Sequence, residues 1–415
     1  MVLDFKVKKR EASGDDSLFH FKIFCANIFC QKKDNAYICR NYKTMKHLTY
    51  LIFLMILFSC SPHKPNWDLG ESETKYSSLL GIYEIEDSIY LCQIKNPWQI
   101  DKTLAQYLLL PKEISDFETK KTKLEKKYEE CTILISPLEK ITLTSSCHGY
   151  VLEQIDALKN ISVFCDADYV VYDKVKNKIM TGEIVNGGNS MNPSIEIILS
   201  RGCDAIYVSP FENTSQSFGS TLPIPIIYCA DYMETSPLGR AEWIRFFGLL
   251  VNKTQEADSL FGVIEKNYND IAKEIKDTCD SSKKKTLLAE LPYQSTWYVP
   301  GGKSSMGILY KDAGYKYQWE DDTHSGSLAL SPEAVLAKAK DSDVWFFKYY
   351  SDHILTKDEF LGQDSYFGQF DAVKNNEVYG CNTMMTDFYD VTPFRPDILL
   401  DELKNSGGRY FHKIK

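Results

Sequence analysis

The fold of this chain is decided by the stretch Thr254-Gln-Glu-Ala-Asp-Ser-Leu-Phe-Gly-Val-Ile-Glu-Lys-Asn-Tyr-Asn-Asp-Ile-Ala-Lys-Glu-Ile-Lys-Asp-Thr278. Its apolar side chains recur at helical spacing: Ala257, Leu260, Phe261, Ile264, Tyr268, Ile271 and Ile275. At 1.5 Å per residue such a helix would be about 36 Å long, with Thr254 suited to cap it. Just before it, Ser236-Pro237 is typical of an N-cap followed by a first-turn proline, so another helix should run to about Val251. A helix of this length can act as a rigid strut between two lobes.

Short apolar β runs alternate with helical segments on both sides of this stretch. Strands are expected at 141–144, 204–208, 223–229, 286–291 and 343–347. Helices are expected at 150–158, 195–199, 307–313, 331–340 and 396–403, and a turn at 145–149. Strand–helix alternation at this spacing favours parallel sheets covered by helices. The predicted fold class is therefore α/β, with two lobes joined by one long helix.

The region ahead of the first lobe has a different pattern. Residues 82–85 and 88–94 alternate apolar and polar side chains around Glu86-Asp87, which predicts a small N-terminal β-hairpin. Residues 112–130 are rich in charge and are expected to form a solvated connection. The expected divisions are a leader (1–59), a lipidated tether (60–75), an N-terminal extension (76–139), an N-terminal α/β lobe (140–236), inter-lobe helices (237–280) and a C-terminal α/β lobe (281–415).

An apolar run, Leu48-Thr-Tyr-Leu-Ile-Phe-Leu-Met-Ile-Leu-Phe-Ser-Cys60, follows Met45-Lys46. It is shorter than the roughly 20 apolar residues that span a bilayer, so an export signal is favoured over a spanning helix. Leu57-Phe-Ser-Cys60 resembles a bacterial lipobox, in which cleavage precedes an acylated cysteine, here Cys60. Residues 1–44 are interpreted as an over-called start, with translation beginning at Met45. A core helix and an uncleaved anchor are the alternatives.

The composition of the remaining 356 residues bounds the function. Residues 1–59 hold ten Lys/Arg and five Asp/Glu, which leaves 38 basic and 52 acidic residues and a net charge of −14. Without a basic cluster to neutralise phosphates, nucleic-acid binding is not expected. Eight cysteines follow Cys60 without a CxxC pair, so a structural metal site is not predicted. One or two disulfides are compatible with an oxidising compartment, but their pairing is open.

Two segments repeat one another. Asn192-Pro-Ser-Ile-Glu-Ile-Ile-Leu199 and Leu330-Ser-Pro-Glu-Ala-Val-Leu336 each have a Ser/Pro start and a glutamate in the first helical turn, and each leads to a strand. This weak duplication indicates one lobe repeated. A favourable interaction with the helix N-terminus is enough to explain both glutamates, Glu196 and Glu333.

Over about residues 140–403 the sequence resembles the substrate-binding proteins of bacterial ABC importers for cobalamin and ferric siderophores. The resemblance rests on Ile141-Thr-Leu-Thr-Ser-Ser146, on the two repeated segments and on the long helix. Residues 229–243 look like versions of the family from Bacteroidetes. The resemblance implies the class III periplasmic-binding-protein fold, with two Rossmann-like lobes and a ligand cleft between them. It also implies that Glu196 and Glu333 dock onto permease arginines, a two-point electrostatic register.

Ligands of open α/β lobes bind beyond the carboxyl ends of the strands. The segments that follow the expected strands are rich in aromatic and methionine side chains in the second lobe, as suits a large, flat, partly apolar ligand. Core packing is the alternative for several of them. The predicted ligand-binding residues are Ser146, His148, Phe211, Tyr232, Trp297, Tyr298, Gly302, Tyr349, Phe388 and Tyr389.

The same loops hold few cations (Lys303 and Lys348, with Arg240 and Arg395 as weaker candidates), which favours a neutral or bulky chelate such as cobalamin over an anionic siderophore. Haem would need a ligand such as His148 or a tyrosine. Histidines are too few for bare metal binding. The chain contains no Gly-x-Ser-x-Gly, P-loop or His-Glu-x-x-His sequence, so an enzyme is not predicted.

The resemblance therefore implies a monomeric, lipid-anchored periplasmic protein that captures a ferric siderophore, haem or cobalamin, without a cofactor of its own, and delivers it to an ABC permease and ATPase. Two alternatives stay open. One is a surface accessory lipoprotein that hands a metal chelate to an outer-membrane transporter. The other is a tetrapyrrole-handling enzyme on the same fold. The choice of chelate, the membrane that holds the anchor and the role of residues 76–139 are not specified by the sequence.

Overall fold

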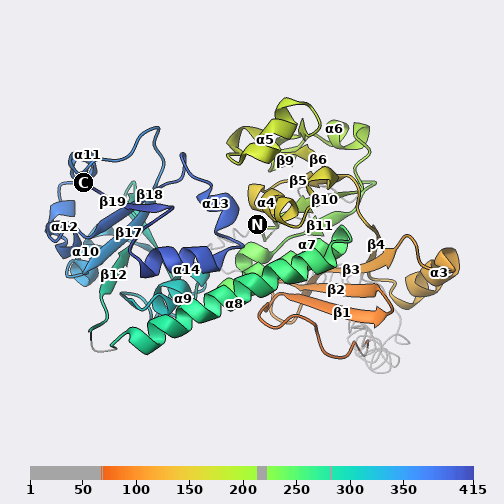
Figure 1. Cartoon of the computed structure of the whole chain (residues 1–415), viewed down its shortest axis with the longest axis horizontal. Helices are drawn as coiled ribbons and strands as arrows, with labels where there is room; N and C mark the ends of the chain where they lie inside the picture. Colours follow the sequence, from red (N-terminus) through yellow and green to blue (C-terminus); the bar gives the residue numbers. More distant parts are fainter. Residues whose placement is uncertain (1–66, 68, 213–221, 281–282) are drawn as a thin grey trace, which may run out of the picture. The chain divides into compact units, whose positions relative to one another are not determined.

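Two consecutive helices, α7 (Pro237–Leu250) and α8 (Thr254–Thr278), join the two lobes (Figure 1). The computed structural model describes residue 67 and residues 69–212, 222–280 and 283–415, and residues 69–415 form one compact unit. The Ser236 Oγ accepts a hydrogen bond from the Gly239 N–H at 3.1 Å, as expected for the predicted helix start. Thr254 is the first residue of α8, and Lys253 occupies its N-cap position. The buried side chains of α8 all belong to the predicted stripe: Ala257, Phe261, Ile264, Tyr268 and Ile275.

The lobe that precedes these helices is built on a parallel five-stranded sheet. Its strand order is β11-β10-β5-β6-β7, with every neighbouring pair parallel. The strands are β5 (Ile141–Leu143), β6 (Ile161–Phe164), β7 (Val185–Asn186), β10 (Ala205–Val208) and β11 (Ile226–Tyr228). The remaining elements are α4 (Ser146–Gln154), α5 (Asp173–Met180), α6 (Ile195–Ser200), β8 (Gly188–Asn189), β9 (Asn192–Pro193) and short 3-10 helices at Leu158–Asn160, Ala167–Tyr169 and Asp231–Met233.

The turn predicted at 145–149 is wrong, because α4 already begins at Ser146 with Ser145 at its N-cap position. Gly149, which made this segment read as a turn, lies inside the helix. A Cβ atom there would come within 2.2 Å of the Tyr172 hydroxyl and 2.8 Å of the Phe164 ring. The glycine is therefore needed for close packing rather than for a turn.

The lobe that follows α8 contains a second five-stranded sheet, in the order β15-β12-β17-β18-β19. Its strands are parallel except for the terminal β19. They are β12 (Thr286–Ala289), β15 (Lys316–Tyr317), β17 (Val344–Tyr349), β18 (Val378–Asn382) and β19 (Phe411–Lys413). A small antiparallel sheet contains β13 (Pro292–Tyr293), β14 (Thr296–Pro300) and β16 (Ser327–Leu330). The helices are α9 (Ser305–Asp312), α10 (Pro332–Ala339), α11 (Lys357–Gln363), α12 (Asp371–Lys374), α13 (Phe388–Val391), α14 (Pro396–Lys404) and a 3-10 helix at Phe367–Gln369.

The N-terminal extension is larger than the predicted hairpin. Its hairpin, β1 (Leu80–Glu86) and β2 (Ile89–Lys95), is joined by β3 (Thr103–Pro111) and β4 (Thr132–Ser136) in a four-stranded sheet. The charge-rich segment 112–130 is largely solvated, as predicted, but it also contains a helix, α3 (Phe117–Lys127), which was not predicted. Leu124 is the one buried side chain of α3, so the apolar period that would have revealed this helix is almost absent.

Two buried glutamates of the central region hold the start of this extension. Glu242 on α7 accepts hydrogen bonds from the backbone N–H groups of residues 75–77 at 2.7–2.8 Å. Glu234 accepts hydrogen bonds from the backbone N–H groups of residues 78 and 79 at 2.9 and 3.0 Å, and from the Trp243 indole at 3.1 Å. Residues 72–74 hydrogen-bond to the β1 backbone at residues 80 and 82, so residues 72–75, expected in the flexible tether, are fixed to the folded unit. The expected leader, the Leu48–Cys60 run and Cys60 lie outside the described residues.

No helix of the described part of the chain has both the length and the apolar character required to span a bilayer. The eight described cysteines are all unpaired, and six of them are buried.

We expect Glu242→Ala to lower the free energy of unfolding by about 3–5 kcal/mol, because it leaves three backbone N–H groups without their acceptor and removes one of the carboxylates beside Arg245. Guanidinium unfolding followed by tryptophan fluorescence measures the loss, and limited proteolysis should show earlier cleavage near residues 75–79. Glu129→Ala, at an exposed position, is the matched control and should stay within about 0.5 kcal/mol of the parent. An unchanged midpoint for the Glu242 variant would contradict this role.

Candidate functional site

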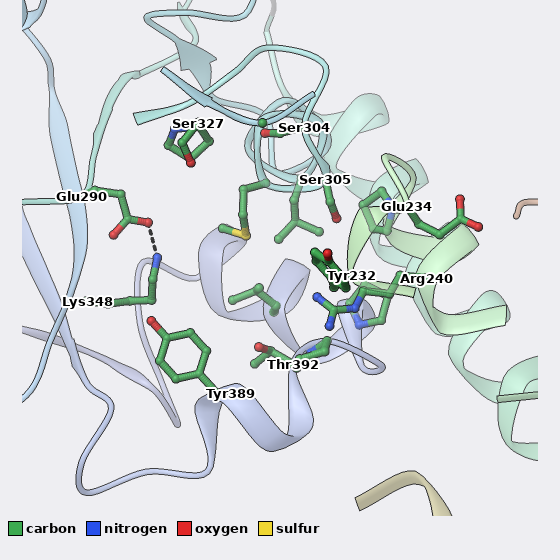
Figure 2. Close-up of a pocket in the computed structure, with 18 of the residues that line it drawn as sticks. Tyr232, Glu234, Arg240, Glu290, Ser304, Ser305, Ser327, Lys348, Tyr389 and Thr392 are labelled. Carbon is green, nitrogen blue, oxygen red and sulfur yellow. Dashed lines mark hydrogen bonds and ion pairs between the residues drawn. The ribbon is translucent and has the colours of Figure 1, made fainter. Parts of the chain in front are cut away.

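A cavity of about 750 Å³ lies between the two lobes (Figure 2). One wall comes from the 3-10 helix Asp231–Met233 and the first turn of α7. The opposite wall comes from the second lobe: the end of β12, the small sheet, α9, β17, α13 and α14. The lining residues used below are Tyr232, Glu234, Arg240, Glu290, Tyr298, Ser304, Ser305, Met306, Ser327, Lys348, Phe388, Tyr389 and Thr392.

Aromatic side chains from both lobes face this cavity without being covered by the protein. Tyr232, Tyr298 and Tyr389 are 40%, 49% and 57% exposed, although each is a large side chain with apolar faces. Met306 and Phe388 add further apolar surface. Exposed rings that surround a concave site indicate a ligand with flat, partly apolar surface of its own.

An ion pair lies on the second-lobe wall, where the Lys348 ammonium binds the Glu290 carboxylate (Figure 2). Burial on its own would lower the pKa of Lys348, but the Glu290 carboxylate beside it raises that pKa above its ordinary value. Glu290 itself has a left-handed backbone, with φ of 64°. Such a conformation is uncommon for a residue with a side chain, and it is kept here by hydrogen bonds of the Glu290 backbone to Phe346 and to the Trp345 indole at 2.8 Å each.

Four of the ten predicted ligand-binding residues line the cavity: Tyr232, Tyr298, Phe388 and Tyr389. The other six lie elsewhere, and strand alternation explains two of them. Trp297 precedes Tyr298 on β14 and therefore points into the core, where it is 0% exposed and donates a hydrogen bond to the Ala289 carbonyl at 3.0 Å. Tyr349 follows Lys348 on β17 and points away, with its hydroxyl 2.9 Å from the His412 Nε2.

The remaining four predicted residues also lie outside this cavity. Gly302 packs among backbone carbonyls, since a Cβ atom there would lie 2.5 Å from the Glu320 oxygen. Ser146 lines a separate hollow of about 300 Å³ at the ends of β5 and β6. Phe211 follows β10 and is 38% exposed. His148 is buried in α4 and contacts Asp231 instead of the cavity.

Several polar lining residues were missed by the sequence reasoning. Glu290 directly follows β12, Ser304 is the N-cap of α9 and Ser305 its first residue, and Ser327 begins β16. The available signal was the Ser304 N-cap pattern, because Ser304 accepts a hydrogen bond from the Gly307 N–H at 3.0 Å. That pattern locates a helix start but does not say what the helix start faces.

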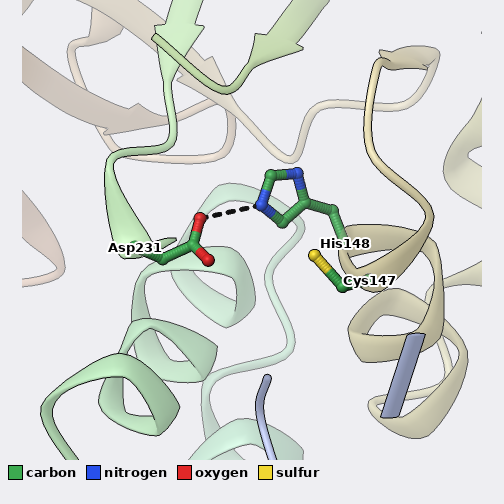
Figure 3. A group of neighbouring side chains, drawn as sticks. All are labelled: Cys147, His148 and Asp231. Carbon is green, nitrogen blue, oxygen red and sulfur yellow. Dashed lines mark hydrogen bonds and ion pairs between the residues drawn. The ribbon is translucent and has the colours of Figure 1, made fainter. Parts of the chain in front are cut away.

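Three buried side chains, Cys147, His148 and Asp231, place their potential metal-ligand atoms within 4.8 Å of one another (Figure 3). The Asp231 carboxylate and the His148 Nε2 are engaged in hydrogen bonds, whereas the His148 Nδ1 has no partner among the described residues. The Asp231 oxygens bind the His148 Nε2 at 2.9 Å and the Arg240 Nε at 3.0 Å. Burial raises the pKa of the Cys147 thiol to about 12, which disfavours the thiolate that a metal requires. The group is therefore a hydrogen-bonded cluster rather than an open metal site.

Glu196 and Glu333 occupy equivalent places in the two lobes. Each is exposed in the first turn of a helix, α6 or α10, that begins with a serine N-cap. Ser194 accepts a hydrogen bond from the Ile197 N–H at 3.4 Å, and Ser331 accepts one from the Ala334 N–H at 3.2 Å. Neither glutamate lines the cavity.

A buried carboxyl group lies where the lobes meet. Asp390 on α13 is 4% exposed, and α13 packs against α4 of the first lobe. In the described part of the chain its Oδ2 atom has no hydrogen-bond partner. Burial raises the pKa of Asp390 from 3.8 to about 6, an effect that the charge of Asp387 reinforces and a hydrogen bond from Ser146 reduces.

We expect Asp390→Asn to become more stable than the parent as pH rises. Below about pH 4 the carboxyl is protonated in both the folded and the unfolded chain, so it carries no ionic penalty. Between pH 3.8 and about 6 only the unfolded chain ionises, so the parent loses stability that the asparagine variant keeps. The difference should reach roughly 1–3 kcal/mol at pH 7. Urea unfolding at pH 4 and pH 7.5 measures it, with Asp401→Asn, at an exposed position, as the control. A pH-independent difference would contradict the burial argument.

The comparisons with known proteins agree with this architecture. A profile of the family described as periplasmic binding protein matches residues 144–383, more than half of the chain. The chain therefore belongs to the periplasmic binding protein family, whose members bind solutes for transport and are not enzymes. Its fold is the two-lobed α/β fold of class III solute-binding proteins with an added N-terminal sheet.

Two sequence relatives come from Methanocaldococcus jannaschii. One is an uncharacterised lipoprotein, 27% identical over 316 residues, which are 73% of this chain and 72% of that protein. The other is an uncharacterised protein, 24% identical over 251 residues, or 59% of this chain and 74% of that protein. Both are archaeal and give no support to the predicted likeness to Bacteroidetes.

Two solved structures share the fold, each with a TM-score of 0.50. One is a possible iron-binding, periplasmic solute-binding protein from Staphylococcus epidermidis, which is 17% identical. The match covers 65% of this chain and 99% of that protein. The other is an ABC transporter substrate-binding protein from Listeria monocytogenes, which is 18% identical. The match covers 65% of this chain and 98% of that protein.

Proposed function

We propose that this protein is the lipid-anchored substrate-binding component of an ABC importer, which captures an iron complex (a ferric siderophore or haem) or cobalamin between its lobes and delivers it to an inner-membrane permease. The observation that carries the proposal is the inter-lobe cavity of about 750 Å³, lined by exposed tyrosines from both lobes. A volume at the upper end of the usual 300–1,000 Å³ range suits a bulky chelate better than a bare ion or a single amino acid.

The names of similar proteins are consistent with this role. The Staphylococcus protein of the same fold is called a possible iron-binding protein, and the Listeria protein belongs to an ABC transporter. The relative that is 27% identical over 316 residues is named a lipoprotein. In the proposal, Cys60 carries the lipid and holds the folded unit at the periplasmic side of a membrane. The tyrosine-lined cavity supports capture of a chelate, and the exposed helix starts of both lobes support delivery.

The direct test is ligand titration of the full chain in mild detergent with cyanocobalamin, haemin, a ferric catecholate and a ferric trihydroxamate. We expect sub-micromolar quenching of tryptophan fluorescence by one of them, because the buried Trp297 directly precedes the cavity residue Tyr298. Tyr298→Ala and Tyr389→Ala should each weaken that binding roughly 10-fold, as expected for the loss of an aromatic contact. Tyr350→Ala, an exposed tyrosine outside the lining, is the control. A folded chain that binds none of the four would contradict the proposal.

We further propose that Glu196 and Glu333 contact arginines of the permease. The double variant Glu196→Ala/Glu333→Ala should keep its ligand affinity within about twofold, since neither carboxylate lines the cavity, while uptake falls at least 10-fold. Uptake of radiolabelled ligand by cells in which the variant replaces the parent measures this. Glu125→Ala/Glu129→Ala removes the same charge from exposed positions of the extension and should leave uptake intact. Loss of ligand binding in the first variant would refute the docking role.

A further inference from the structure

Arg240 reaches the cavity from the first turn of α7, and a buried carboxylate, that of Asp231, holds its guanidinium on the side away from the cavity. Its Nε donates a hydrogen bond to the Asp231 Oδ2 at 3.0 Å, and the other Asp231 oxygen lies 2.9 Å from the His148 Nε2. The Asp231 and His148 side chains are each 1% exposed, whereas that of Arg240 is 23% exposed. A buried pair therefore holds one edge of the guanidinium while the opposite edge meets the cavity.

The buried pair is suited to this task electrostatically. Burial on its own would raise the pKa of Asp231, but the charges of His148 and Arg240 together lower that pKa below its ordinary value. The carboxylate thus stays ionised and keeps its hold on the arginine. His148 is itself enclosed by the Phe247 and Phe394 rings, at centroid distances of 5.1 and 6.1 Å, which restrict its orientation.

The free edge of the guanidinium points into the cavity (Figure 2). Among the described residues no hydrogen-bond partner reaches its two terminal nitrogens. The guanidinium carbon lies 5.7 Å from the centre of the Phe394 ring, so one of its faces is occupied by an apolar surface. Two parallel N–H donors in a fixed plane match the spacing of the oxygens in a carboxylate or phosphate group.

The other charged groups of the cavity lining are already engaged. Lys348 is paired with Glu290. Glu234 turns its carboxylate away from the cavity (Figure 2) and binds the backbone of residues 78 and 79. In the described lining, Arg240 is thus the cation whose donors remain open to a ligand. The predicted preference for a neutral chelate rested on the number of cations in the loops. The sequence does not show which of these cations are paired within the protein, so it could not distinguish Arg240 from Lys348.

We propose that Arg240 binds a carboxylate or phosphate group of the ligand through both terminal nitrogens, and that His148 and Asp231 are positioning residues that aim the guanidinium. The inference rests on the proposed function, because it takes the cavity as the ligand site. It narrows the ligand class to chelates that carry a free anionic oxygen group. It also places that contact on the inter-lobe helix rather than on either sheet.

The test uses two matched pairs of probes with the full chain in mild detergent. N-succinyl and N-acetyl ferrioxamine B differ in one carboxylate, and haemin differs from its dimethyl ester in two. We expect the parent to bind the carboxylate member of at least one pair roughly 10- to 150-fold more tightly. Arg240→Gln should abolish that preference while the affinity for the neutral member changes less than about threefold. Lys316→Gln, an exposed lysine outside the cavity, is the charge-matched control and should keep the preference.

The outcomes separate this inference from the proposed function. If the parent binds both members of a pair equally, or if Arg240→Gln weakens both members alike, the anion contact is refuted while chelate binding stands. If the folded parent binds no probe and none of the four ligands titrated above, the proposed function fails and the inference falls with it.

The positioning role is tested by the same ratio of affinities rather than by affinity alone. His148→Ala and Asp231→Asn should reduce the carboxylate preference at least fivefold, and His148→Gln should restore most of it, because its amide can still donate to Asp231. A structural role would instead lower both affinities in parallel and leave the ratio unchanged. Thermal melting of each variant shows that it is folded, and His148→Gln keeps the test decisive if Asp231→Asn does not fold.

Discussion

The burial of α7 is the constraint on which the rest of the structure depends. Of its 14 residues, all but Arg240 and Arg245 are buried, so the helix has no solvent face of ordinary width. A helix without a solvent face must pack against other elements of the protein on every side. Here α8, the first lobe, the second lobe and the N-terminal sheet supply that cover, and Phe247 contacts both the Tyr207 ring of one lobe and the Phe394 ring of the other. The lobes are therefore placed by a shared core helix rather than by a loose linker.

The burial of α7 also explains why the charged side chains on and near it have partners, because a buried charge is costly unless it is paired or hydrogen-bonded. Glu242 and Glu234 accept hydrogen bonds from backbone N–H groups at the start of the extension, and these bonds attach residues 75–79 to the core. Arg245 binds Asp258 of α8 at 2.7 Å. The extension, whose role the sequence left open, thus supplies hydrogen-bond donors to two buried carboxylates, one of which, Glu234, borders the inter-lobe cavity.

Much of the fold could be predicted because it depends on local patterns. The stripe of α8, the proline at the start of α7 and the serine caps of α6 and α10 each act within a few residues. The site was harder for a geometric reason. Which of two neighbours on a strand faces the cavity depends on register, so Trp297 was grouped with Tyr298, and Tyr349 was chosen where Lys348 faces the cavity. The helix α3 was not predicted because Leu124 is its one buried side chain, so its sequence lacks an apolar period.

Arg240 and Lys348 show why counting cations in loops cannot define a binding site. Both residues line the same cavity, and both contact a carboxylate of the protein. A lysine presents a single compact charge, so the Glu290 carboxylate largely satisfies Lys348. An arginine presents separate donors along two edges, so Asp231 can bind Nε and still leave the terminal nitrogens for a second anion. Pairing with Glu290 therefore neutralises Lys348, whereas pairing with Asp231 orients Arg240 and leaves its terminal nitrogens able to recognise an anion.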